Sequence, residues 1–210
     1  MCKIGFEHSQ SDAGIFIHKA KNGDIIVAMI NVNVAGIKNY TMVFDGKTNE
    51  GWIAHSDSNW AADVNNCHSV TGYFFKLAGS LVSWLSRAQK TVALSSTKAE
   101  YMTISDCCCQ AMWMTNLFGE IGFHVSLITI CGDNQGSIFI GSNPVQKKRT
   151  KHIDIHYHYI HECIEDNKVS VVFVSGNNNP ADMFTKNLDH LKFVKFREQL
   201  GLTLGPTKNA

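Results

Sequence analysis

The sequence contains no apolar run that approaches the roughly 20 residues needed to span a bilayer, so no membrane-spanning helix is expected. Its opening residues, MCKIGFEHSQ, lack the apolar core of a secretory signal. There are 7 cysteines but no C-x-x-C pair, which argues against a disulfide framework or a zinc ribbon. We therefore predict an intracellular protein, cytoplasmic or nuclear, with reduced thiols.

The sequence also lacks a strong charge bias, since its formal net charge is only +1. Any binding to nucleic acid must therefore depend on a local basic patch and not on a global field. With 210 residues, of which 44% are hydrophobic, the chain is long and apolar enough for one sizeable domain plus an additional piece.

Alternating apolar and polar residues, turn signals and helical spacing divide the chain into two parts. Residues 14–35 read as a β-hairpin around Asn22-Gly23. From about residue 51 the predicted order is three adjacent strands, a helix, a strand, two helices, a strand and a final helix. Tight turns join the first three strands, whereas helices precede the later two. This pattern predicts an α/β fold with a mixed sheet flanked by helices.

Four acids follow or flank predicted strands: Asp57, Glu100, Asp133 and Asp182. Sites in open α/β sheets form at strand ends, and clustered carboxylates repel one another unless cations neutralise them. Carboxylate oxygens suit Mg²⁺ or Mn²⁺, and two such ions can hydrolyse a phosphodiester. Each acid also has a structural explanation. Glu100 could complete a capping box that begins at Thr97, Asp182 could be a first-turn acid, and Asp57 and Asp133 could be turn residues.

Longer motifs carry a resemblance to a known family. HSDSNWAAD, SWLSRAQKTVALSSTKAEY, GDNQ, TKHID and PADMFTK occur in one order along the chain. Residues 51–202 closely resemble the ribonuclease H domain of copia-type retrotransposon Pol polyproteins. The resemblance implies a ribonuclease H-like fold, with a five-stranded mixed sheet. It also implies endonucleolytic hydrolysis of the RNA strand of an RNA–DNA hybrid, which leaves 5′-phosphate and 3′-hydroxyl ends.

The family's four catalytic and metal-binding acids fall on Asp57, Glu100, Asp133 and Asp182. The implied cofactors are two Mg²⁺ or Mn²⁺ ions, with no small-molecule cofactor. Asp57 would bridge both ions, Glu100 and Asp133 would bind one of them, and Asp182 would bind the other.

The N-terminal part is similar to the end of the reverse transcriptase palm of the same polyproteins, where the family carries Tyr-Val-Asp-Asp. Here the aligned residues are Asn31-Val32-Asn33-Val34, which cannot hold the polymerase metals. We therefore divide the chain into a degenerate reverse transcriptase fragment at 1–40, a connector at 41–50, the ribonuclease H-like domain at 51–202 and a tail at 203–210. The chain is not expected to polymerise.

Contacts with nucleic acid are predicted at two places. The basic run Lys147, Lys148, Arg149 and Lys151 would bind phosphates, and Asn134 and Gln135 would reach the minor groove of the hybrid. The cluster His152, His156, His158 and His161 has a spacing that zinc can use, but it is interpreted as structural.

Departures from the family pattern support a second hypothesis for the function. Asn59 stands where the family usually has an Asp, and His156 and His161 stand where it has arginines. None of these changes removes a catalytic acid, but the lost positive charge weakens contacts with the backbone of the hybrid. The alternative function is therefore a catalytically inert relic that folds and at most binds nucleic acid weakly.

Overall fold

The computed structural model describes residues 51–77, 79–142 and 151–204 and, before them, only four short strands. Side chains are described for 51–77, 79–141 and 158–202. The four early strands are β1 (Glu7–His8), β2 (Ile15–Lys19), β3 (Ile25–Met29) and β4 (Tyr40–Met42).

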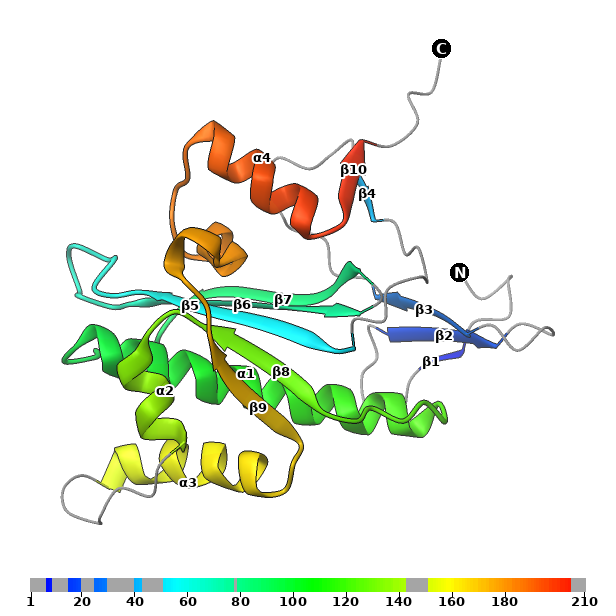
Figure 1. The fold of residues 1–210 in the computed structure, drawn as a ribbon, viewed down its shortest axis with the longest axis horizontal. Coiled ribbons are helices and arrows are strands. Elements are labelled where there is room, and N and C mark those ends of the chain that lie inside the picture. The colour runs from blue at the N-terminus through cyan, green and yellow to red at the C-terminus, as the bar shows by residue number, and fades with distance from the viewer. Residues whose placement is uncertain are drawn as a thin grey trace.

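The centre of the fold is a five-stranded sheet with the strand order β7-β6-β5-β8-β9 (Figure 1). Its strands are β5 (Ile53–Asn59), β6 (Val70–Leu77), β7 (Ser80–Ala88), β8 (Ile128–Gly132) and β9 (Val169–Phe173). Neighbours among β5, β6 and β7 are antiparallel, whereas β8 runs parallel to both β5 and β9. This topology confirms the predicted mixed sheet, because short turns can join only antiparallel strands whereas parallel strands need helical crossovers.

Helices cover both faces of this sheet (Figure 1). In the figure, α1, α2 and α3 lie on one side, and η3 and α4 lie on the other. Their bounds are α1 (Ser96–Glu120), α2 (Gln135–Ser142), α3 (Lys151–Glu165), the 3₁₀ turns η2 (Gly176–Asn178) and η3 (Pro180–Phe184), and α4 (His190–Gln199). None of the helices in the described ranges is long and apolar enough to cross a membrane.

The core is divided by the sheet into two apolar clusters. Phe74 and Phe75 are both fully buried but belong to different clusters, because successive side chains of a strand point to opposite faces. The larger cluster packs α1 and α3 against the sheet and includes Trp52, Phe75, Ile104, Met114, Ile128, Ile130 and Ile160. The smaller cluster holds η3 on the other face through Phe74, Leu81, Ala181, Phe184, Leu200 and Leu202.

The start of α1 differs from the capping box considered above. The N-cap is Ser95, whose side chain accepts a hydrogen bond from the amide of Lys98 at 3.2 Å. Thr97 is therefore already inside the helix, and Glu100 lies beyond the position that a capping box uses. The capping-box explanation of Glu100 is wrong, and its carboxylate has another partner, described below.

The predicted N-terminal hairpin is confirmed, since β2 and β3 pair antiparallel with Phe16 opposite Ala28. Its turn and residues 31–34 lie outside the described residues. Farther along, β4 pairs antiparallel with β10 (Leu202–Leu204), so that Tyr40 lies opposite Leu204. This small sheet joins the end of the predicted reverse transcriptase fragment to residues just beyond α4.

Candidate metal centre

Three of the four predicted acids meet at the edge of the sheet where β5 and β8 end. Asp57 lies near the end of β5, Asp133 follows β8 directly, and Asp182 belongs to η3. One carboxylate oxygen from each lies within 4.8 Å of the others. Oxygens from three separate elements at this spacing, at the carboxyl ends of parallel strands, can surround a hard divalent cation.

Burial and mutual repulsion make this cluster electrostatically costly. Burial raises the pKa of Asp57, an effect that the hydrogen bond from Thr185 and the charge of Lys186 only partly oppose. Burial also raises the pKa of Asp133, and the negative charge of Asp57 adds to the shift. Carboxyls that resist ionisation side by side gain most from a nearby cation, so the donor set fits Mg²⁺ or Mn²⁺.

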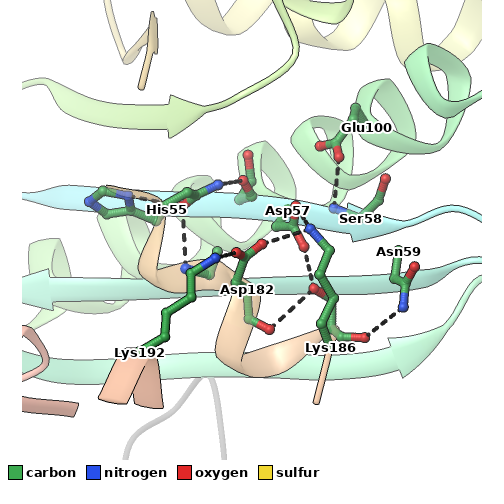
Figure 2. Close-up of polar contacts among 12 residues, drawn as sticks. His55, Asp57, Ser58, Asn59, Glu100, Asp182, Lys186 and Lys192 are labelled. Atoms are coloured by element: carbon green, nitrogen blue, oxygen red, sulfur yellow. Dashed lines mark hydrogen bonds and ion pairs between the residues drawn. The ribbon is translucent and has the colours of Figure 1, made fainter. Parts of the chain in front are cut away.

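Glu100 faces the same region from α1 but is outside this three-carboxylate group. Its Oε1 accepts a hydrogen bond from the backbone amide of Ser58 at 3.0 Å, as Figure 2 shows. Burial, followed by the charge of Asp57, raises the pKa of Glu100 to about 8. The structure therefore brings Asp57, Asp133 and Asp182 together and leaves Glu100 beside them, bound to the strand that carries Asp57.

The buried amide of Asn179 fixes η3 against β5. Its Nδ2 donates to the carbonyl of Ser56 at 2.8 Å, and its Oδ1 accepts from the amide of Ala181 at 3.2 Å. The same oxygen lies 3.2 Å from Nδ1 of His55, whose ring stacks on Phe74. Asn179 thus ties the segment that carries Asp182 to the strand that carries Asp57.

Replacing Asn179 by alanine is expected to lower the free energy of unfolding by about 2 kcal/mol, because buried groups that lose hydrogen-bond partners cost roughly 1–3 kcal/mol each. Urea denaturation followed by circular dichroism measures the change. The neighbouring Asn178 is exposed, and among the described residues its side chain accepts only from Lys195, so Asn178→Ala is the matched control. Equal stability of the two variants would contradict the role given to Asn179.

The other end of η3 is held as closely to the sheet. Ser86 donates to the carbonyl of Phe184 at 2.6 Å, and Nδ2 of Asn59 donates to the carbonyl of Thr185 at 3.2 Å. An aspartate at position 59 could not donate this hydrogen bond. The departure from the family pattern at Asn59 therefore has a structural partner in this chain.

Gly72 makes this close approach possible. It lies directly opposite Asp57 in the sheet, and a Cβ built on it would clash with Cγ2 of Thr185 and lie 2.9 Å from Cβ of Phe184. It would also lie 3.1 Å from the backbone carbon of Phe184. Backbone cannot swing aside as a long side chain can, so any other residue here must push η3 away from the sheet.

Gly72→Ala is accordingly expected to destabilise the fold by about 1–3 kcal/mol, the usual cost of overpacking, and to separate Asp182 from Asp57. The control is Gly51→Ala, because no atom lies within 4 Å of a Cβ built at that exposed position. Thermal unfolding reports the stability. If Gly72→Ala and Gly51→Ala melt alike, η3 does not sit where the structure places it.

Two lysines, Lys186 and Lys192, and one threonine contact the acid cluster, and Figure 2 labels the two lysines beside Asp57 and Asp182. Nζ of Lys186 lies 3.1 Å from Oδ1 of Asp57 and 2.7 Å from Oδ1 of Asp182. Nζ of Lys192 lies 2.6 Å from Oδ2 of Asp182, and Thr185 donates its hydroxyl to Oδ2 of Asp57. Burial lowers the pKa of Lys186, but its hydrogen bond to Asp182 and the charge of Asp57 outweigh burial and raise it overall.

Sequence reasoning missed these partners, although PADMFTK contained two of them. Lys186 follows Asp182 by four residues, and this spacing was the available signal for that pair. The contacts of Thr185 and Lys186 with Asp57 cross 128 and 129 residues, and no local pattern predicts contacts of that kind.

The structure describes only some of the residues that were predicted to contact nucleic acid. Lys147, Lys148 and Arg149 lie outside the described residues, as does the side chain of Lys151. Gln135 is exposed, whereas Oδ1 of Asn134 accepts from the amide of Ser137 at 2.9 Å and caps the start of α2. Of the histidine cluster, His158 is exposed and His161 is half-buried, and the side chains of His152 and His156 are not described.

Comparison with known proteins gives several relatives among retrotransposon polyproteins. No protein-family model matches the chain. The retrovirus-related Pol polyprotein of transposon TNT 1-94 from Nicotiana tabacum is 38% identical over 148 residues, which are 70% of this chain and 11% of that polyprotein. The corresponding polyprotein of transposon RE1 from Arabidopsis thaliana is 33% identical over 175 residues, which are 82% of this chain and 12% of the relative.

Among solved structures, a ribonuclease H1 isolated from compost by a metagenomic approach aligns with a TM-score of 0.49 and 12% identity. The alignment covers 64% of this chain and 92% of that protein.

The chain spans about a tenth of the length of the polyproteins that it matches. The sequence identities with these polyproteins show that the homologues of the chain are retrovirus-related Pol polyproteins of copia-type transposons.

Proposed function

We propose that this chain hydrolyses the RNA strand of RNA–DNA hybrids with divalent cations, as part of a retrotransposon polyprotein. The observation that carries this proposal is the convergence of Asp57, Asp133 and Asp182 from three elements to within 4.8 Å. The homology to Pol polyproteins and the order of the ribonuclease H motifs along residues 51–202 support the same reaction.

Asp57, Asp133 and Asp182 would hold the cation, and Glu100 is placed to complete the set if its carboxylate turns away from the amide of Ser58. When bound, such cations supply positive charge and Lewis acidity to the scissile phosphodiester. We expect two Mg²⁺ or Mn²⁺ ions, as the family resemblance implies.

The chain's own residues orient the acids. His55, which lies close to them, is not expected to act as a general acid. Burial lowers the pKa of His55 to about 4, so its ring is neutral near pH 7. It serves as a partner of Asn179 and not as a general acid. Asn179, Ser86 and Asn59 keep η3 on the sheet, and Thr185 orients the carboxylate of Asp57.

The test is cleavage of a hybrid whose RNA and DNA strands carry different labels. We expect shortened RNA with 5′-phosphate ends in Mg²⁺ or Mn²⁺, an intact DNA strand, and no product in EDTA. Single-stranded RNA of the same sequence is the control for contaminating ribonucleases. Cleavage in EDTA, or equal cleavage of the single strand, would contradict the proposal.

A second candidate is a non-catalytic fold that binds nucleic acid weakly. One observation favours it: Lys186 and Lys192 already satisfy the charges of Asp57 and Asp182 without a metal. This alternative predicts salt-sensitive binding to the hybrid with no product, and the same binding after Asp57→Asn.

A further inference from the structure

All four carboxylate oxygens of Asp57 and Asp182 already have partners within the chain. Lys186 contacts one oxygen of each acid, Thr185 takes the second oxygen of Asp57, and Lys192 takes the second oxygen of Asp182. Both acids are almost fully buried, with side-chain exposures of 1% and 5%. Two buried carboxylates are thus held by the chain's own cations at the place where a divalent ion would bind.

Lys186 has the central position among these partners. Its ammonium lies between the two acids, whereas Lys192 contacts only Asp182 and stands over the ring of Phe196, 5.3 Å from its centroid. A divalent cation needs the same oxygen lone pairs and is strongly repelled by an ammonium at contact distance. The cation and Lys186 therefore cannot both keep these contacts with Asp57 and Asp182.

The side chain of Lys186 has a route out of the cluster. It is 36% exposed, and its backbone follows the end of η3. Rotation about its side-chain bonds can move the ammonium into solvent without moving the backbone. Asp57 and Asp182, by contrast, are fixed by the sheet and by η3.

We propose that Lys186 is a built-in counter-cation of the acid cluster, which a divalent ion must displace in order to bind Asp57 and Asp182. The inference rests on the proposed function only in taking this cluster as the divalent site. It has two consequences. The acids remain compatible with folding when no metal is bound, and the affinity for metal is lower than the carboxylates alone would give.

The first test measures Mn²⁺ affinity of the full chain by electron paramagnetic resonance. Lys186→Met removes the charge and keeps the length, so the Kd is expected to fall by about tenfold or more. Lys186→Arg keeps the charge and is expected to stay within about threefold of the parent. Lys195→Met is the matched control, because Lys195 is exposed and bonds Asn178 instead of an acid.

The second test uses the unmodified chain and does not depend on the folding of a variant. Acetylation of lysines is followed by mass spectrometry while Mg²⁺ is added. Lys186 is expected to react faster as the site fills, whereas the rate at Lys195 stays constant. This readout follows the ammonium itself, which a purely structural salt bridge would not release.

The two proposals fail in different ways. Tighter Mn²⁺ binding by Lys186→Met supports the displacement even if no hybrid is cleaved. Unchanged or weaker binding by Lys186→Met, no Mn²⁺ binding by either protein, or constant acetylation of Lys186 at saturating Mg²⁺ would overturn it, whatever the cleavage assay gives.

Discussion

Asp57→Asn is expected to slow metal-dependent cleavage of the hybrid by about a thousandfold or more. Asp57 is the acid that touches both the Lys186 ammonium and the Thr185 hydroxyl, and it lies on β5, the central strand of the sheet. Asparagine keeps its shape but removes its charge. Because metal ions supply several kcal/mol of charge stabilisation and each 1.4 kcal/mol is about tenfold in rate, the loss of one ligand charge accounts for this factor.

The same stretch of sequence offers the matched control. Asp63 is six residues away in HSDSNWAAD, but it accepts hydrogen bonds from Asn65 and Asn66 in a surface turn. Asp63→Asn should therefore cleave the hybrid at the parent's rate. Thermal melting must show that Asp57→Asn is folded. Equal cleavage by both variants would mean that the observed activity does not come from the acid cluster.

The second large effect concerns pH and metal-free stability. The folded-state pKa of Glu100 is about 8, compared with 4.5 for the unfolded chain. Between these values the unfolded chain has released the proton and the folded chain keeps it. Stability from this group is therefore fully present below pH 4.5 and is lost as the pH rises toward 8.

Glu100→Gln is expected to remove this loss of stability at rising pH, because glutamine does not ionise. In EDTA, the variant should gain stability relative to the parent as the pH rises from 5 to 8, by several kcal/mol at most, since one pKa unit corresponds to about 1.4 kcal/mol. The glutamine oxygen can still accept from the amide of Ser58. Denaturation curves at several pH values measure the difference. If the parent and the variant change in parallel, Glu100 does not keep a proton in the folded chain.

Much of the fold followed from local pattern. The order of strands and helices predicted from residue 51 is the observed one, and a short turn joins β6 to β7 as predicted. Such elements are predictable because periodicity, turn residues and crossover rules act over a few residues at a time. The same reasoning placed three acids at strand ends, and those three acids do converge.

The interior of the site was not predictable in this way. Asn179 holds η3 on β5, and Gly72 leaves room for Thr185. Both contacts join residues more than 100 positions apart, which no local pattern predicts. The local pattern around Glu100 suggested a helix cap, whereas its carboxylate accepts from the amide of Ser58 on β5, 42 residues away. Asn59 departs from the family pattern, and its hydrogen bond to the Thr185 carbonyl is another contact that the local sequence does not predict.

The most direct measurement of the central claim is anomalous diffraction from crystals grown with Mn²⁺. We predict an anomalous peak from a manganese ion that is bound by oxygens of Asp57, Asp133 and Asp182. The ammonium of Lys186 should have moved away from Asp57 and Asp182. A saturated crystal that shows no peak among these carboxylates, or a peak on the histidines of α3 instead, would contradict the assignment of this cluster as the metal centre.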